Sequence, residues 1–87
     1  MYEWDEVKRC TNLAKHDVDF GRMEDFEWDT AVIDPETDHD EPRWTAKGLI
    51  GPVLYVVVYT ERGDNLRIIS LRKATRREAL RYAEKQE

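Results

Sequence analysis

The fold is decided by residues 43–73, which read RWTAKGLIGPVLYVVVYTERGDNLRIISLRK. Three segments of this stretch are rich in β-branched and aromatic residues, and they cover residues 43–50, 53–60 and 66–73. Gly51-Pro52 and residues 61–65 separate them. Because turns this short join neighbouring antiparallel strands, the stretch predicts a three-stranded meander. Its middle segment is apolar on both faces and predicts a central strand.

The chain before this stretch predicts two helices and one further strand. Asp5 is a suitable N-cap for a helix that runs to about Lys15 and is closed by His16-Asp17. Its expected buried stripe consists of Val7, Cys10, Leu13 and Ala14. The later elements are a short helix over 20–28, a strand over 30–34 that ends at Pro35, and an acidic loop over 36–42.

The chain after the meander predicts one helix. Thr75 and Glu78 have the spacing of a capping box, in which each side chain satisfies a backbone donor near the other. Ala79, Leu80 and Ala83 form the expected apolar side of this helix. The order of elements predicts the α+β class, with two N-terminal helices, a four-stranded antiparallel sheet and a C-terminal helix.

Length and composition favour a single cytosolic domain over residues 1–87. Charged residues make up 38% of the chain, and the longest apolar run has seven residues, at 53–59. A membrane-spanning helix needs about 20, so we expect no membrane partner. The first residues lack the basic and apolar regions of a secretory signal, and the single cysteine, Cys10, cannot form an internal disulfide.

The charge is divided along the chain. Residues 1–41 hold four basic and fourteen acidic residues, whereas residues 42–87 hold ten basic and five acidic residues. The basic half can hold an anion and the acidic half can meet a basic protein, although solvated surface explains the same pattern.

Few motifs suggest a cofactor. The four glycines are too scattered for a phosphate-binding loop. We expect Cys10 to be a small buried hydrophobe rather than a nucleophile. Asp38-His39-Asp40-Glu41 resembles a metal-binding cluster, but adjacent residues of one loop seldom converge on an ion. We therefore expect no metal and no cofactor, and a solvated acidic loop.

The stronger feature is a set of arginines along the last two strands and the final helix, at positions 62, 67, 72, 76, 77 and 81. By strict alternation, Arg72 shares a strand face with Leu66 and Ile68. A guanidinium on such a face needs an anionic partner, which is either an internal carboxylate such as Glu78 or a bound phosphate. Tyr82 is expected nearby as a hydrogen-bond donor.

Two long motifs resemble the BrnT family of bacterial type II toxins. The first is Trp4-Asp5-Glu6-x-Lys8, followed by Asn12-Leu13-x-Lys15-His16-x-Val18-x-Phe20. The second is Tyr59-Thr60-Glu61-Arg62-Gly63, followed by Arg67-Ile68-Ile69-Ser70-x-Arg72-x-Ala74 and Glu78-x-x-x-Tyr82. The resemblance covers nearly the whole chain, and residues 34–43 least.

The resemblance implies a RelE-like ribonuclease fold and an RNase activity, on free or ribosome-bound RNA, that arrests translation. It also implies neutralisation by a BrnA-type antitoxin with a ribbon-helix-helix region, so that DNA is bound only through the antitoxin complex. An alternative is a non-catalytic module that only engages its antitoxin. Cleavage of labelled RNA in EDTA distinguishes the two.

RNA can be cut without a metal when its 2′-hydroxyl attacks the adjacent phosphate. For charge stabilisation we expect Arg62 and Arg72, with Arg67 as the next candidate. The base is Glu78 or His16, and Tyr82 is an acid or a positioning group. The expected phosphate contacts are Lys8, Lys15, Arg77 and Arg81. For His16 the competing interpretation is a helix C-terminal residue that interacts with the dipole, and for the two lysines it is ordinary helix-surface charge.

Overall fold

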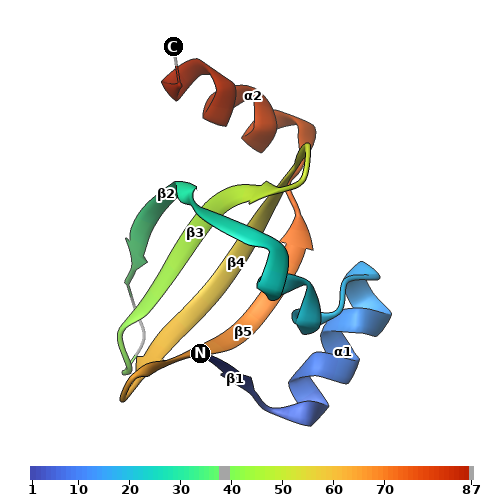
Figure 1. Cartoon of the computed structure of the whole chain (residues 1–87), viewed down its shortest axis with the longest axis vertical. Coiled ribbons are helices and arrows are strands. Elements are labelled where there is room, and N and C mark those ends of the chain that lie inside the picture. The colour runs from blue at the N-terminus through green and yellow to red at the C-terminus, as the bar shows by residue number, and fades with distance from the viewer. Residues whose placement is uncertain (38–39, 87) are drawn as a thin grey trace.

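The computed structural model describes residues 1–37 and 40–86 and has one five-stranded sheet with helices before and after it (Figure 1). The elements are β1 (Tyr2–Trp4), α1 (Glu6–His16), the 3-10 helix η1 (Phe20–Asp25), β2 (Phe26–Glu36), β3 (Arg43–Ile50), β4 (Val53–Arg62), β5 (Asn65–Lys73) and α2 (Arg76–Lys85). The order across the sheet is β1-β5-β4-β3-β2. The α+β class is thus confirmed, although the sheet has five strands rather than the predicted four.

The predicted meander is confirmed. Strands β3, β4 and β5 pair antiparallel in sequence order, and β4 is the central strand of the sheet. Gly51 and Gly63 in the two turns both have a φ of 59°, which glycine adopts without strain. Short-range turn chemistry therefore fixes this part of the molecule.

The fifth strand, β1, was not predicted. Tyr2 to Trp4 pair parallel with Leu66 to Ile68 of β5, so the sheet is mixed rather than purely antiparallel. Three residues are too few to show a strand periodicity, and their partner lies more than sixty positions away in the chain.

The second helix and the first predicted strand have different bounds from those expected. The helix is 3-10 and ends at Asp25, and β2 begins at Phe26 and continues through Pro35 to Glu36. Pro35 is tolerated because β2 is an edge strand, where a missing N–H leaves no neighbouring strand unpaired. The prediction that Pro35 ends the strand was wrong.

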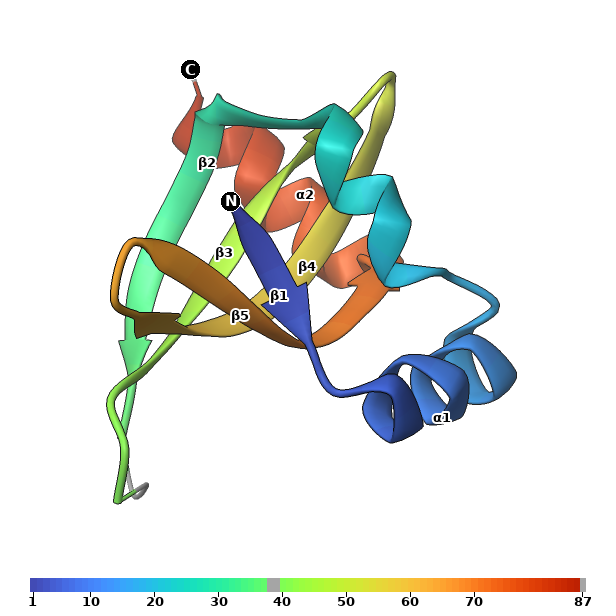
Figure 2. The ribbon, with the colours of Figure 1, turned by 60° about the horizontal axis from the view of Figure 1, so that its bottom comes forward.

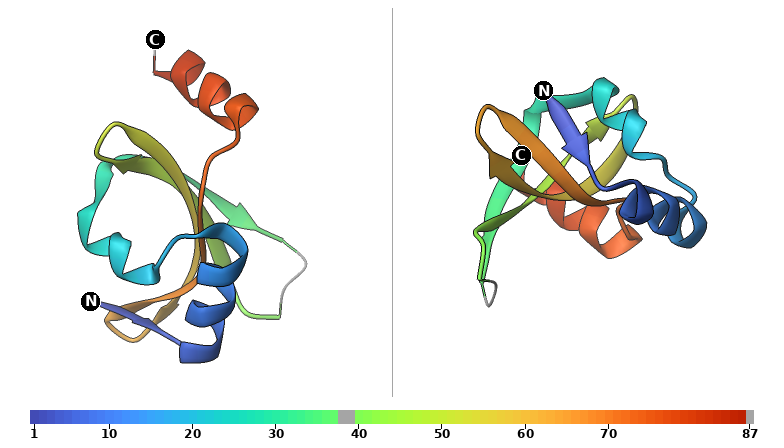
Figure 3. Two further views of the ribbon diagram at one scale, coloured as in Figure 1. Left: turned by 90° about the vertical axis from the view of Figure 1, so that its right-hand side faces the viewer. Right: turned by 90° about the horizontal axis from the view of Figure 1, so that it is seen from below.

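The core lies on one face of the sheet, under η1. Phe20 and Met23 of η1 are 0% and 1% exposed and belong to the same buried cluster as Val57 and Leu71. Helix α2 lies on the opposite side of the sheet from η1, as Figures 2 and 3 show. Helix α2 approaches the second face, which we call the open face because the core cluster does not lie on it, although Val56 at its centre is only 3% exposed.

Helix α1 has the predicted N-cap at Asp5 but not the predicted buried stripe. Val7 is 74% exposed, Cys10 is exposed, and so are Leu13 and Ala14. The expectation that Cys10 is buried was wrong. The buried residue of α1 is the polar Asn12, and its contacts explain the difference.

Asn12 joins α1 to the edge of β5. Its Oδ1 accepts from the N–H of Leu71 at 3.1 Å, and its Nδ2 donates to the carbonyls of Leu71 at 2.7 Å and of Val18 at 2.9 Å. The amide thus continues, at Leu71, the pairing that β1 provides from Leu66 to Ile68. Buried backbone groups at the end of the sheet need such partners, so a polar residue faces inward here.

Helix α2 has the predicted capping box at Thr75 and Glu78, but its predicted apolar side is not buried. Leu80 is 57% exposed, and Ala79 and Ala83 are exposed. In Figure 3 the helix stands away from the sheet. In the described ranges, 1–37 and 40–86, no helix has the length and apolar character needed to cross a membrane.

Candidate functional site

A bulge in β5 determines which way Arg72 faces. Ser70 pairs with Val58 and Ile68 with Tyr59, so Ile69 is an extra residue between them. Ile68 and Leu71 therefore both lie on the core side, and Arg72, opposite Val56, lies on the open side. The prediction that Arg72 shares a face with Leu66 and Ile68 was wrong, because strict alternation fails at the bulge.

Arg72 is held by Glu78 in a two-pronged ion pair. Its Nη1 and Nη2 lie 2.7 and 3.0 Å from the Glu78 carboxylate oxygens, and Oε1 of Glu78 also accepts from the N–H of Thr75 at 2.8 Å. The hydrogen bonds from Arg72 lower the pKa of Glu78 to about 2. Glu78 is therefore ionised near neutral pH and is a poor base. Of the two partners predicted for Arg72, the structure shows the internal carboxylate.

His16 is the last residue of α1 and is half-buried. Burial lowers its pKa, and the charges of Lys15 and Arg72 lower it further. A helix C-terminus acts in the opposite direction, because its dipole favours the cation. A neutral imidazole near pH 7 can accept a proton.

A groove between α1 and β5 has a volume of about 250 Å³, and we call it the α1 groove. Lys8, Thr11, Lys15 and His16 line it from α1, and Ser70 lines it from β5. No carboxylate is among its described lining residues, so the two lysines give it an uncompensated positive charge. This groove is suited to a phosphate-bearing ligand.

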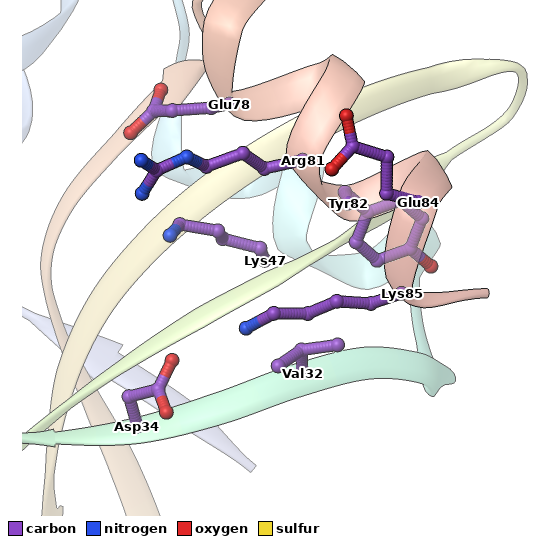
Figure 4. A pocket seen from close by; sticks show the side chains of 8 residues that line it. All are labelled: Val32, Asp34, Lys47, Glu78, Arg81, Tyr82, Glu84 and Lys85. Atoms are coloured by element: carbon purple, nitrogen blue, oxygen red, sulfur yellow. The ribbon is translucent and has the colours of Figure 1, made fainter.

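A second hollow, of about 280 Å³, lies between α2 and the strands β2 and β3 (Figure 4), and we call it the α2 hollow. Its lining residues are Val32, Asp34, Lys47, Glu78, Arg81, Tyr82, Glu84 and Lys85. Glu78 thus belongs both to this hollow and to the pair with Arg72. The sequence indicated Arg81 but missed Lys47 and Lys85.

Lys47 could have been noticed as the one charged residue within the strand segment 44–50. Its position under α2 follows only from the register, because Lys47 pairs with Val32 on one side and Val56 on the other. Lys85, near the end of α2, carries no distinguishing sequence signal.

Tyr82 fastens α2 to the sheet. Its hydroxyl donates to the carbonyl oxygen of Thr30 at 2.5 Å, and the residue is half-buried. The hydroxyl proton is engaged by the backbone, so the geometry favours a positioning role over that of an acid.

Arg62 and Arg67 lie at the other end of β5 and are not brought to Arg72. Arg67 Nη1 lies 2.9 Å from Glu3, and Arg62 Nη2 lies 3.0 Å from Glu41. Hydrogen bonds from Asn65 and Arg67 lower the pKa of Glu3. Five residues of strand separate Arg67 from Arg72, about 16 Å. The structure thus pairs these two arginines with carboxylates of the N-terminal half.

The remaining predicted residues lie apart from the Arg72–Glu78 pair. Arg77 is exposed on the outer side of α2, in a shallow depression that includes Leu80 and Arg81. The acidic loop included the metal-binding cluster considered at residues 38–41. Asp38 and His39 lie outside the described residues, so the structure does not test this cluster.

A protein-family model matches most of the chain. The model of a family described as a ribonuclease toxin, BrnT, of a type II toxin–antitoxin system matches residues 4–78. The matched region includes His16, Arg72 and Glu78 and ends before the rest of α2. A comparison with curated proteins gives no match.

Proposed function

The chain belongs to the BrnT family of ribonuclease toxins of type II toxin–antitoxin systems, and on that premise we propose that it cuts RNA by 2′-hydroxyl attack beside Arg72. The observation that carries the proposal is the Arg72 guanidinium that Glu78 holds in place, on the same strand as Ser70, which lines the α1 groove together with His16. The α1 groove, with Lys8 and Lys15, receives the RNA backbone next to this pair.

In the proposed reaction the imidazole of His16 takes the proton of the 2′-hydroxyl. The 2′-oxygen then bonds to phosphorus and the bond from phosphorus to the 5′-oxygen breaks, while that oxygen takes a proton from water and the resulting hydroxide takes the proton held by His16. The products are a 2′,3′-cyclic phosphate and a 5′-hydroxyl, and no metal takes part. Arg72 stabilises the added negative charge of the phosphorane through its permanent positive charge and through the N–H groups that the pair with Glu78 leaves free.

The pH dependence of cleavage tests the role of His16. Because the folded-state pKa is lowered, we expect kcat/KM to rise with pH to a plateau, with an apparent pKa below 6.5. His16→Gln should lose most of the cleavage rate, and the remaining rate should no longer rise with pH in this range. Labelled RNA in EDTA provides the assay, and cyclic-phosphate ends identify the reaction. Arg22→Gln, on η1 across the sheet, is the matched surface control.

A non-catalytic module is the second candidate function. The observation that favours it is that both terminal nitrogens of Arg72 are already bonded to Glu78. Under this alternative, neither free nor ribosome-bound RNA is cut, while the antitoxin still binds. Cleavage by the wild type that Arg72→Ala removes contradicts it.

Membership of a type II family implies an antitoxin partner. For this partner we propose a BrnA-type protein with a ribbon-helix-helix region, which covers the cations of the C-terminal half and blocks the site in the cytoplasm. Arg77 and Arg81 are exposed and available to acidic groups of the partner.

Arg77→Glu combined with Arg81→Glu should weaken antitoxin binding markedly, and the loss should shrink as salt rises because screening reduces the new repulsion. Titration calorimetry with the antitoxin at two ionic strengths measures this. If variant and wild type bind the antitoxin with equal affinity at both ionic strengths, the antitoxin binds the acidic N-terminal half instead.

A further inference from the structure

The α2 hollow contains three cations that the proposed reaction does not use. Lys47 comes from β3, and Arg81 and Lys85 come from α2. Figure 4 shows their charged ends pointing to the same side of the hollow, between Glu78 and Asp34. Among residues 1–37 and 40–86, none of the three forms an ion pair.

Three cations without an ion-pair partner that gather at one hollow favour the binding of an anion. Arg81 and Lys85 are four residues apart on one helix, where like charges repel, and Figure 4 shows the ammonium group of Lys47, from β3, between their charged ends. Of the carboxylates that line the hollow, Glu78 is engaged by Arg72, and Asp34 and Glu84 are exposed at its rim. Such a local conflict is expected where a ligand binds.

The hollow lies on the same sheet face as Arg72. Lys47 pairs with Val56 of β4, and Val56 pairs with Arg72 of β5, so the three occupy one row across the sheet. Two strand spacings separate the backbones of Lys47 and Arg72, about 10 Å. Glu78 lies between the two positions, since it lines the hollow and binds Arg72. Neighbouring phosphates of one nucleic-acid strand can reach both.

We infer that the α2 hollow binds a second phosphate of the RNA strand whose reacting phosphate lies at Arg72. This inference rests on the proposed function and extends it, because it makes the substrate a single strand with phosphates beyond the one that is cut. The guanidinium of Arg81 and the ammonium groups of Lys47 and Lys85 supply charge-assisted donors. The shared face with Arg72 favours RNA over an acidic protein segment as the occupant.

The test is binding of a 2′-fluoro RNA oligonucleotide, which lacks the attacking hydroxyl but keeps every phosphate. Fluorescence anisotropy across a salt series compares the full chain with Lys47→Gln plus Lys85→Gln. Each lost contact should reduce the slope of log K against log salt by about 0.7 for a single strand. The charge-conserving pair Lys47→Arg plus Lys85→Arg should keep the slope, and so should Arg22→Gln. A thermal melt establishes that each variant is folded.

Cleavage separates this inference from the proposed function. We call the double variant Lys47→Gln plus Lys85→Gln the glutamine pair. Its kcat/KM should fall more on an oligonucleotide than on a dinucleoside monophosphate, because the dinucleotide has no second phosphate. If the wild type binds and cuts RNA while the glutamine pair keeps its slope, this inference alone is overturned. If the wild type neither binds nor cuts RNA, the proposed function fails as well. If the glutamine pair loses antitoxin binding but no RNA binding, the hollow belongs to the protein partner, and the inference is wrong.

Discussion

The two α-helices begin alike and are attached to the sheet in different ways. Each has a side-chain N-cap, Asp5 for α1 and Thr75 for α2, and each has an apolar stripe. Neither stripe is buried. Helix α1 is joined to the sheet by the buried amide of Asn12, whereas α2 contributes no buried residue and is held by the Arg72–Glu78 pair and by Tyr82. The difference teaches that periodicity locates a helix but does not identify its contacts.

The attachments of the two helices also differ in the space that they leave between helix and sheet. Asn12 places α1 beside β5, where burial and the charges of Lys15 and Arg72 lower the pKa of His16. The attachments of α2 lie near its start and at Tyr82, so the α2 hollow remains between the helix and the strands β2 and β3. Helix α1 thus carries a candidate base, His16, and helix α2 borders a candidate binding site, the α2 hollow.

The largest effect is expected for Arg72, which Glu78 of α2 holds in an ion pair. Arg72→Ala should lower kcat/KM for RNA about 10²- to 10³-fold, the usual loss when one group that stabilises transition-state charge is removed. Arg72→Lys keeps the charge without the fork and should recover part of the rate. Kinetics on labelled RNA measure both. A rate within threefold of wild type for Arg72→Ala, roughly 0.6 kcal/mol, would remove Arg72 from the reaction.

The next effect concerns the attachment of α1. Asn12→Leu should destabilise the protein by about 2–3 kcal/mol, because the N–H and carbonyl of Leu71 lose their partner inside the protein. Urea unfolding measures the change. Cys10→Ala, on the exposed side of the same helix, should stay within about 0.5 kcal/mol. Equal effects of the two substitutions would mean that Asn12 does not anchor α1.

A smaller effect is expected at the start of α2. Thr75→Ala removes the N-cap and should cost α2 about 1 kcal/mol. Because α2 buries no residue, amide exchange should speed up about fivefold within 76–85 and much less within α1. Hydrogen exchange followed residue by residue measures this. Equal acceleration in both helices would show that α2 unfolds only together with the core.

The smallest effect is expected on the exposed side of α2. Leu80→Ser should change the free energy of unfolding by less than about 0.5 kcal/mol, because the side chain is 57% exposed. Met23→Ala, at a residue that is 1% exposed, is the buried counterpart and should cost about 2–5 kcal/mol. A large loss of stability for Leu80→Ser would mean that α2 packs on the sheet in solution.

The sequence by itself determined the elements that depend on neighbours a few positions away. The meander, its two glycine turns, the N-cap at Asp5 and the capping box at Thr75 and Glu78 were predicted and are present. Each rests on a backbone conformation or hydrogen bond formed within a few residues, so its signal is contained in a short window of sequence. Glu78 was likewise named from local spacing as one of the two kinds of partner predicted for Arg72, and the structure shows this pair.

Only the tertiary structure decided what depends on residues far apart in the chain. The pairing of β1 with β5, the inward-facing Asn12 and the position of Lys47 under α2 each require a partner from another element. The bulge at Ile69 turned Arg72 to the open face, and Arg62 and Arg67 went to carboxylates at the other end of the sheet. The physical reason is that an unpaired backbone group or charge is satisfied by whichever group the folded chain brings within reach, and the sequence does not rank those groups.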